Sequence, residues 1–282
     1  MARPLALLAL IGAVAVSGCA TAPVRGLAWR TGLWCGGNRA ERQAAGANAA
    51  SLQTLPIDPF GRPEQGWAIY APSLQRDLRT PCPGFAGSLA RWQSHRGLPP
   101  SGVLDAASLT PMKSDWQARR PFVALRAQGV CPIPPPDQAL VSTSPAESLG
   151  DRPIRLRPGA LKAYRRMVAA ARREAPELEG DPNLLRIFSA WRDPDADAAR
   201  CAQEGNCQGI VRAACSAHRT GLAIDLMLGA APGFTADSSI DANRLFQSRT
   251  PAYRWLVRGA GRFGFVNYAF EPWHWEWTGE AP

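Results

Sequence analysis

Two short segments carry residues whose types and order suit metal chemistry. One reads SAHRTGLAID over residues 216–225, and the other reads EPWHWE over residues 271–276. His218, Asp225 and His274 would offer a divalent cation two imidazoles and one carboxylate, a donor set typical of zinc. Three protein ligands leave a fourth position open to water, so the set predicts one catalytic zinc ion per chain rather than a closed structural site.

Asp225 lies in a predicted strand over residues 222–228. Side chains alternate between the two faces of a strand, so one face is apolar and is assigned to the core. Its members are Leu222, Ile224 and Leu226. Asp225 is then presented on the opposite face. A carboxylate in so apolar a strand needs a partner, and a cation shared with His218 would supply one.

A catalytic zinc site also needs a base that takes a proton from the attacking water. Glu271 and Glu276 are the candidates. If residues 273–277 are extended, Glu276 shares a face with His274 and suits a supporting role. Glu271 lies one proline-fixed turn earlier and can approach the water from the side. We therefore favour Glu271 as the base and keep Glu276 as the alternative.

Together the two segments resemble the zinc D-alanyl-D-alanine peptidases of the VanY and VanX type, the LAS peptidase family. The family pattern is S-x-H-x-x-G-x-A-x-D followed by E-x-W-H, and every fixed position of it is present here. The resemblance implies that His218, Asp225 and His274 bind zinc and that Glu271 is the base.

The resemblance also implies a role for the arginine after the preceding strand, which by position is Arg192. Its guanidinium suits the terminal carboxylate of a substrate or a developing oxyanion, and Ser216 is the second predicted substrate-binding residue. An exposed loop arginine is the alternative for Arg192. One position departs from the pattern. Many VanY-like proteins have an Arg-Tyr pair after the tryptophan-histidine motif, where this chain has Trp275-Glu276-Trp277, which leaves the substrate shape on that wall open.

Helical and extended periodicities surround these segments. Helices are predicted over residues 161–171 and from an N-cap at Thr250 to Gly259. Strands are predicted over residues 184–189, 263–268 and 273–277. The mixture predicts an α+β fold with a small antiparallel sheet and helices, preceded by a small all-α module.

The all-α module rests on residues 85–109, which predict a helix, a Gly/Pro turn and a second helix. The stretch resembles the peptidoglycan-binding-like domain. The matching elements are Trp92-Gln93, Gly97-Leu98-Pro99 and Gly102-Val103-Leu104-Asp105. A generic pair of helices is the alternative. His95 is expected to be a solvated residue at a helix end.

A proline-rich break separates the two halves of the chain. Cys131 is followed by Pro132-Ile133-Pro134-Pro135-Pro136, and prolines remove backbone donors and favour extended conformations. The predicted division is a lipoprotein signal peptide at 1–18, an N-terminal segment at 19–60, a peptidoglycan-binding-like helical domain at 61–120, a Pro-rich linker at 121–150 and a zinc peptidase domain at 151–282.

The N-terminus has the features of a secretory signal: Arg3, an apolar run over residues 5–16, and small residues before Cys19. It resembles the lipobox of bacterial lipoproteins, which implies lipidation of Cys19 and a lipid anchor on the periplasmic side of the cell envelope. The outer membrane of a Gram-negative bacterium is favoured for this anchor, and the inner membrane is the alternative. An ordinary signal cleaved near residues 20–22 is the alternative. Export argues against nucleic acid as a partner, and the net charge of +9 suits anionic lipid and peptidoglycan.

Six cysteines remain beyond Cys19. They are Cys35, Cys82, Cys131, Cys201, Cys207 and Cys215. An even number in an oxidising compartment favours disulfides, whose pairing the sequence does not give. A second metal site at the last three is the alternative.

The expected function is therefore a zinc carboxypeptidase that removes the terminal D-alanine of peptidoglycan stem peptides. Two alternatives remain open. One is an endopeptidase that cuts peptidoglycan internally, and the other is a non-catalytic, zinc-stabilised lipoprotein that binds the cell wall. A dipeptidase of the VanX type is disfavoured, because a wall-binding module suits a polymeric substrate.

Overall fold

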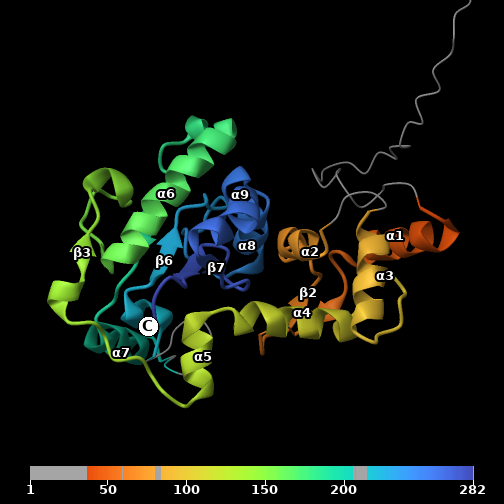
Figure 1. Ribbon diagram of the computed structural model, residues 1–282, viewed down its shortest axis with the longest axis horizontal. Helices are drawn as coiled ribbons and strands as arrows, with labels where there is room; N and C mark the ends of the chain where they lie inside the picture. Colours follow the sequence, from red (N-terminus) through yellow and green to blue (C-terminus); the bar gives the residue numbers. More distant parts are fainter. Residues whose placement is uncertain (1–36, 59, 80–83, 206, 208–214, 282) are drawn as a thin grey trace, which may run out of the picture.

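The computed structural model of the protein describes residues 37–58, 60–79, 84–205, 207 and 215–281. They form two lobes, a helical module (residues 37–127) and a sheet domain (residues 151–281), with α5 placed where the two meet (Figure 1). The predicted α+β class is confirmed. Within the described residues, none of the helices has the length and apolar character needed to cross a membrane. Cys19, with its predicted lipidation, lies outside the described residues.

The helical module consists mainly of short helices. They are α1 (Arg39–Ser51), α2 (Ala71–Asp77), α3 (Phe85–His95), α4 (Ala106–Ala118) and α5 (Pro121–Ala127), and β1 (Pro56–Ile57) pairs with β2 (Glu64–Gln65). Asn38 begins α1 with a reciprocal capping box to Glu41. The buried side chains of Trp67, Tyr70 and Leu89 are part of the module's core. His95 is exposed at the end of α3, as predicted.

Hydrogen bonds from two side-chain amides hold the turn between α3 and α4 in place. The buried amide of Gln93 accepts a hydrogen bond from Gly102 N at 2.8 Å and donates one to the Val103 carbonyl at 3.0 Å. Gly102 has φ +69°, and a Cβ there would lie 2.7 Å from the Ala86 carbonyl oxygen. Asn48 of α1 closes the same turn from the other side, by donating to the Gly102 carbonyl and accepting from Leu104 N.

The segment between the lobes contains more regular structure than its proline content predicts. Besides α5 it includes two 3-10 turns, Asp137–Ala139 and Pro145–Glu147, and the strand β3 (Val141–Ser142). β3 pairs with β4 (Arg155–Leu156) of the sheet domain, so part of the predicted linker is attached to that domain.

The central sheet has four antiparallel strands in the order β5-β6-β8-β7. Their bounds are Ile187–Ser189, Ala223–Leu226, His274–Trp277 and Phe265–Asn267. Each strand falls inside the range that the sequence predicts and is shorter than it. The register places Asp225 opposite His274 and Ala223 opposite Glu276.

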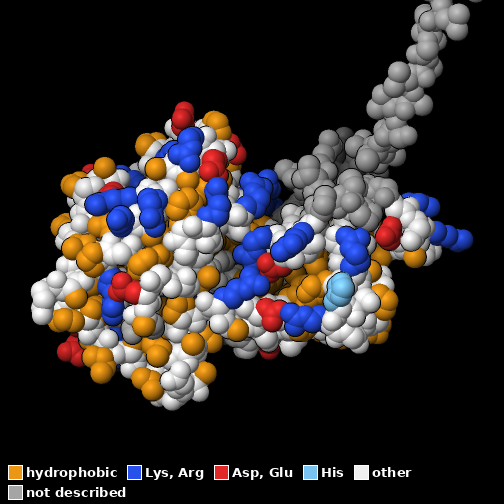
Figure 2. All heavy atoms as spheres, viewed as in Figure 1, with side chains coloured by type: hydrophobic (Ala, Val, Ile, Leu, Met, Phe, Trp, Pro, Cys, Tyr) orange, Lys and Arg blue, Asp and Glu red, His pale blue; other side chains and the backbone are white. Residues whose placement is uncertain are grey.

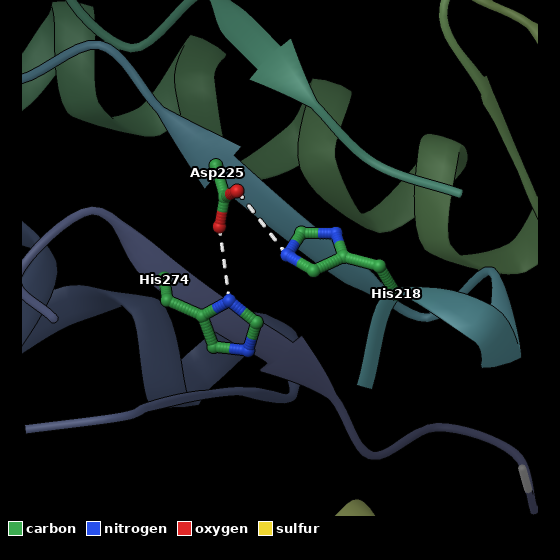
Figure 3. A group of neighbouring side chains, drawn as sticks. All are labelled: His218, Asp225 and His274. Carbon is green, nitrogen blue, oxygen red and sulfur yellow. Dashed lines mark hydrogen bonds and ion pairs between the residues drawn. The ribbon is translucent and has the colours of Figure 1, made fainter. Parts of the chain in front are cut away.

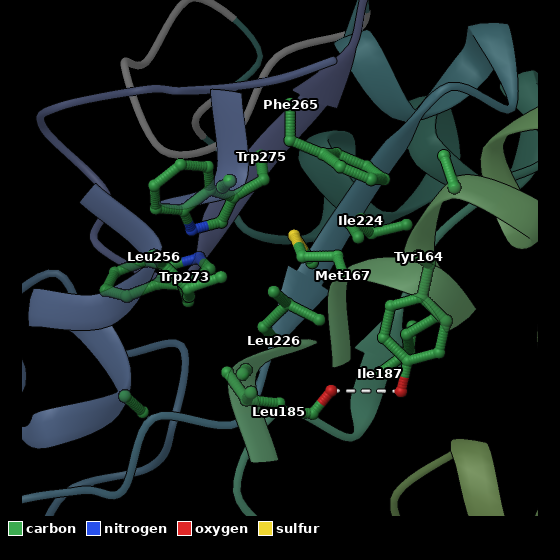
Figure 4. Close-up of a cluster of buried hydrophobic side chains, with 14 of the residues drawn as sticks. Tyr164, Met167, Leu185, Ile187, Ile224, Leu226, Leu256, Phe265, Trp273 and Trp275 are labelled. Carbon is green, nitrogen blue, oxygen red and sulfur yellow. Dashed lines mark hydrogen bonds between the residues drawn. The ribbon is translucent and has the colours of Figure 1, made fainter. Parts of the chain in front are cut away.

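Helices cover the apolar face of this sheet. The long α6 (Pro158–Glu174) and the helix α9 (Pro251–Gly259) pack on it. Leu222, Ile224 and Leu226 lie in this core as predicted, and Figure 4 shows the last two among their neighbours. Thr250 caps α9 by accepting a hydrogen bond from Tyr253 N, also as predicted. The remaining elements are α7 (Pro194–Gln203), α8 (Asp241–Ser248) and the 3-10 turns Pro176–Gly180, Ala217–Thr220 and Ala260–Phe263.

Two disulfides connect four of the cysteines. Cys131 is bonded to Cys215, and Cys201 is bonded to Cys207. The first bond attaches the proline-rich segment to the chain immediately before Ser216. Disulfides rather than a second metal site are therefore the outcome for these four, whereas Cys35 and Cys82 lie outside the described residues.

Arginine and lysine side chains are spread over both lobes on the face drawn in Figure 2, and they are more plentiful there than aspartate and glutamate. This distribution agrees with the net charge of +9.

Candidate active site

Side chains of His218, Asp225 and His274 meet on the polar side of the central sheet (Figure 3). One ligand atom from each lies within 4.8 Å of the other two, and all three residues are buried. His274 on β8 stands directly opposite Asp225 on β6, so strand register alone brings these two together. The three residues predicted to bind a metal therefore lie next to one another in the structure.

His218 reaches the cluster from a single 3-10 turn, Ala217–Thr220, which ends at Gly221. Gly221 has φ +71°, a conformation that glycine adopts without steric cost. The His218 Nδ1 atom lies 2.6 Å from the Ala190 carbonyl oxygen, which can only accept a hydrogen bond. Nδ1 therefore carries the proton, and Nε2 faces Asp225 Oδ2 at 3.2 Å with its lone pair available.

His274 presents its other ring nitrogen. Its Nδ1 lies 2.9 Å from Asp225 Oδ1, while its Nε2 is buried without a hydrogen bond among the described residues. Glu276 Oε1 lies 3.5 Å from that Nε2, which is longer than an ordinary hydrogen bond. Glu276 and His274 share one face of β8, as predicted.

The charges of the cluster are those of a cation site. Burial opposes ionisation of Asp225, but its interactions with His218 and His274 hold its pKa well below the usual range. Burial and the nearby Arg192 lower the pKa of His218, which keeps that imidazole neutral as a ligand must be. Burial also opposes the charging of His274, yet hydrogen bonding to Asp225 raises its pKa to about 9. Two imidazoles and one buried carboxylate supply the donor atoms and the negative charge that zinc binding requires.

The two candidate bases occupy different sides of His274. Glu271 faces the main cleft with 12% of its side chain exposed, and its Oε2 lies 4.0 Å from His274 Nδ1, on the side where the ligand atoms converge. Burial raises the pKa of Glu271 to about 7. Glu276 lies behind the ring and accepts hydrogen bonds from Arg120 Nε at 2.7 Å and from Phe122 N at 3.1 Å.

Arg192 and Ser216 are joined by Asp197, a buried residue of α7 that sequence reasoning missed. Arg192 Nη1 lies 3.4 Å from one oxygen of Asp197, and Ser216 Oγ donates to the other at 2.9 Å. Arg192 Nη2 lies 3.8 Å from Asp225 Oδ2. Arg192 is part of the wall of both cavities beside the cluster, and 26% of its side chain is exposed, so it is no free loop arginine.

Two cavities adjoin the cluster. The larger, of about 530 Å³, is bordered by Asp225, Glu271 and Arg192, together with Arg152, Arg155 and Arg200. The smaller, of about 240 Å³, lies on the His218 and His274 side and includes residues of α5. The contribution of α5 could not be predicted from the sequence, because its residues are distant in sequence from both motifs.

Residues 153–280 match the model of a protein family described as VanY, D-alanyl-D-alanine carboxypeptidase. The sheet domain belongs to the VanY family. It is therefore the domain of a metallopeptidase, with His218, Asp225 and His274 as its buried potential metal ligands.

No curated protein matches this chain. Among solved structures, this chain is similar over part of its length to the LdcB LD-carboxypeptidase, whose structure is described as revealing the molecular basis of peptidoglycan recognition. The two chains are 21% identical, the match covers 50% of this chain and 68% of the other, and the TM-score is 0.34. The disulfides indicate that the protein resides outside the cytoplasm.

Proposed function

We propose that the chain is a zinc-dependent carboxypeptidase that hydrolyses D-alanyl-D-alanine termini of peptidoglycan stem peptides. One observation carries the proposal: a buried cluster of two histidines and an aspartate stands beside a second, more exposed carboxylate at the wall of a cleft. A structural metal site has no need of that second carboxylate. The membership of residues 153–280 in the VanY family favours the same reaction.

Zinc would be held by His218 Nε2, His274 Nδ1 and the carboxylate of Asp225. When bound, it supplies a Lewis acid that polarises the scissile carbonyl and makes water a stronger nucleophile at neutral pH. The chain's own residues fix the ligand geometry. The Ala190 carbonyl orients His218, and the pairing of β6 with β8 orients Asp225 and His274.

Glu271 is the proposed base. It takes a proton from the attacking water and returns it to the leaving amine as the C–N bond breaks. A carboxyl that exchanges a proton near neutral pH is suited to both steps, and burial raises the pKa of Glu271 to about 7. Glu276 is a poorer candidate, because its oxygens are directed to Arg120 and Phe122 N behind the ring of His274.

Arg192 is the proposed substrate-binding residue, with Ser216 acting through Asp197 and at the wall of the smaller cavity. Arg192 Nε is buried and makes no hydrogen bond among the described residues. A charged donor of this kind suits the terminal carboxylate of a stem peptide or the oxyanion that forms during hydrolysis.

The cellular setting is proposed from the N-terminal sequence and the helical module. Lipidation of Cys19 would anchor the chain to a membrane, on the periplasmic side, with the VanY domain facing peptidoglycan. The Trp92-Gln93 and Gly97-Leu98-Pro99 elements favour a peptidoglycan-binding-like role for the module. Endopeptidase activity is the second candidate, because two cavities extend to either side of the metal ligands.

The test incubates the zinc-loaded protein with a stem pentapeptide ending in D-Ala-D-Ala, a stem tetrapeptide and cross-linked muropeptides, with and without a chelator. Products are identified by mass. Chelator-sensitive loss of one D-alanine from the pentapeptide alone is the expected result. Cleavage of the tetrapeptide alone would assign an LD-specificity, and cleavage of cross-links would assign an endopeptidase. No chelator-sensitive cleavage by zinc-loaded protein would reject the enzymatic proposal.

A further inference from the structure

We propose that Arg120, which lies outside the VanY-matched residues, is a positioning residue of the metal centre. It acts on the ligand His274 through Glu276. The inference rests on the proposed zinc site and adds to it a part that the family match does not include, because the match begins at residue 153.

Arg120 is aimed by an Arg-Pro corner between two helices. α4 ends at Ala118, and α5 begins at Pro121. A residue before proline is driven to extended backbone, and Arg120 has ψ 124°. The chain therefore turns at Arg120 and directs its side chain away from the helical module. Gln117 of α4 holds the guanidinium by accepting a hydrogen bond from Nη1 at 2.8 Å.

The guanidinium is almost completely buried against the VanY domain. Arg120 Nε and Nη2 lie 2.7 Å and 2.6 Å from Glu276 Oε1, and only 8% of the Arg120 side chain and 3% of that of Glu276 are exposed. The other oxygen of Glu276 accepts a hydrogen bond from Phe122 N. The Arg120 Cζ atom also lies 3.9 Å from the centre of the Tyr268 ring. These contacts leave Glu276 no freedom to rotate away.

Because its position is fixed, the carboxylate of Glu276 is the group that faces Nε2 of His274. Its Oε1 atom is 3.5 Å from His274 Nε2, a buried nitrogen with no hydrogen bond among the described residues. A carboxylate at that position favours the tautomer with the proton on Nε2, which leaves the Nδ1 lone pair directed at the metal site. Carboxylates that support a metal-binding histidine orient the ring and increase its basicity.

The burial of Glu276 is what makes a cation necessary at this position. Only 3% of its side chain is exposed, and an unpaired buried carboxylate there would be costly. Arg120 supplies the missing positive charge from the helical module. The module thereby becomes a part of the active site, and α5 adds Phe122, Val123 and Arg126 to the cavity beside His274.

The test compares the zinc affinity of full-length wild-type protein with that of Arg120→Gln and of the matched control Arg119→Gln. Arg119 is the preceding residue, 51% of its side chain is exposed, and it lies 3.7 Å from Asp77 within the module. Zinc affinity is measured by competition with a chelator. We expect Arg120→Gln to weaken zinc binding by roughly 10- to 100-fold, the usual effect of losing a partner of a ligand. Arg119→Gln should stay within about twofold of wild type.

A second measurement, by nuclear magnetic resonance, reports on the imidazole ring of His274. The chain has only three histidines, so selective ¹⁵N labelling resolves His95, His218 and His274. We expect the Nε2 proton of His274 to be observable in the zinc-loaded wild type and lost to exchange in Arg120→Gln, with the signals of His218 unchanged. Arg120→Lys should be intermediate, and it carries the test if Arg120→Gln does not fold.

Equal zinc affinities of the Arg120 and Arg119 variants would overturn the proposal, as would an unchanged His274 signal. Failure of the proposed function is distinguishable, because it would appear in the wild type itself, either as an absence of zinc at the three ligands or as no chelator-sensitive cleavage by zinc-loaded protein.

Discussion

The strands that carry the metal ligands and the surface that joins the helical module to the VanY domain are built in opposite ways. On β6 and β8, backbone register places Asp225 opposite His274, and both residues belong to short sequence motifs. The joining surface instead relies on buried side-chain ion pairs between residues far apart in sequence. Arg120 pairs with Glu276, and Glu64 pairs with Arg244.

The metal ligands and the contacts that support them are specified by different parts of the chain. The ligands are specified locally, because a strand fixes the direction of each side chain. The contacts that hold the surrounding side chains in place come partly from the helical module. Arg244 shows the same principle. A neutral replacement would leave Glu64 with its hydrogen bond from Tyr70 but without its cation, and it would remove the donor to the Phe270 carbonyl, which immediately precedes Glu271.

The largest effect is expected on the strand side, from Asp225→Ala. The variant removes the only carboxylate among the three proposed ligands. Loss of a residue that merely supports a ligand lowers metal affinity by up to about 100-fold, so loss of the ligand itself should lower it by more. Chelator competition measures the change. Asp237→Ala is the control, since Asp237 borders the same cleft and bonds to Thr235. Wild-type affinity in Asp225→Ala would contradict the assignment of the ligands.

Glu271→Gln should lower kcat by roughly 10²- to 10⁴-fold, the range for general acid-base groups. The amide keeps the shape of the side chain and removes its proton-accepting capacity, so zinc content should stay at wild-type level. The measurements are peptide hydrolysis and metal analysis of the same sample. If Glu276→Gln abolished turnover with zinc bound while Glu271→Gln remained active, the assignment of the base would be reversed.

On the joining surface, Arg244→Met should destabilise the fold by about 3–5 kcal/mol, because it leaves the carboxylate of Glu64 buried without its cation. Denaturant unfolding measures this effect. Arg62→Met is the matched control, since the pair of Arg62 with Asp241 is partly exposed and its loss should cost less than about 1 kcal/mol. Equal losses for the two variants would show that burial of the pair is unimportant.

The smallest effect is expected from Arg165→Gln, at a surface pair remote from the joining surface. Hydrogen bonding from Arg165 lowers the pKa of Glu147 from its ordinary 4.5 to about 2. A lowered carboxyl pKa stabilises the fold above pH 4.5, and this contribution is lost as the pH falls through about 2. The variant should therefore cost about 0.2–1 kcal/mol at pH 7 and less at pH 2, as measured by urea unfolding at both values. A cost that grows towards acid would contradict this explanation.

The sequence predicts the sheet well where a strand has one apolar face. Leu222, Ile224 and Leu226 define that face, and the alternation leaves Asp225 no other place than the polar side. Proline at position 251 and threonine at 250 fix the start of α9 in the same local way. These features depend only on neighbouring residues, which is why they can be read from the chain.

The supporting contacts cannot be predicted in that way. Arg120 and Glu276 are separated by 156 positions, and Arg-Pro alone does not say what the arginine will meet. Asp197 likewise joins Arg192 to Ser216 only once α7 has folded over the site. A buried glutamate beside a histidine requires a cation, but no local pattern in the sequence says which residue supplies it.

Anomalous diffraction at the zinc edge, on crystals of the zinc-loaded protein, tests the central claim most directly. We expect one zinc ion, about 2.0–2.1 Å from His218 Nε2 and from His274 Nδ1, with a carboxylate oxygen of Asp225 as third protein ligand and Glu271 beside the open position. A zinc ion elsewhere in the protein, or one closed off by a fourth protein ligand, would contradict the account.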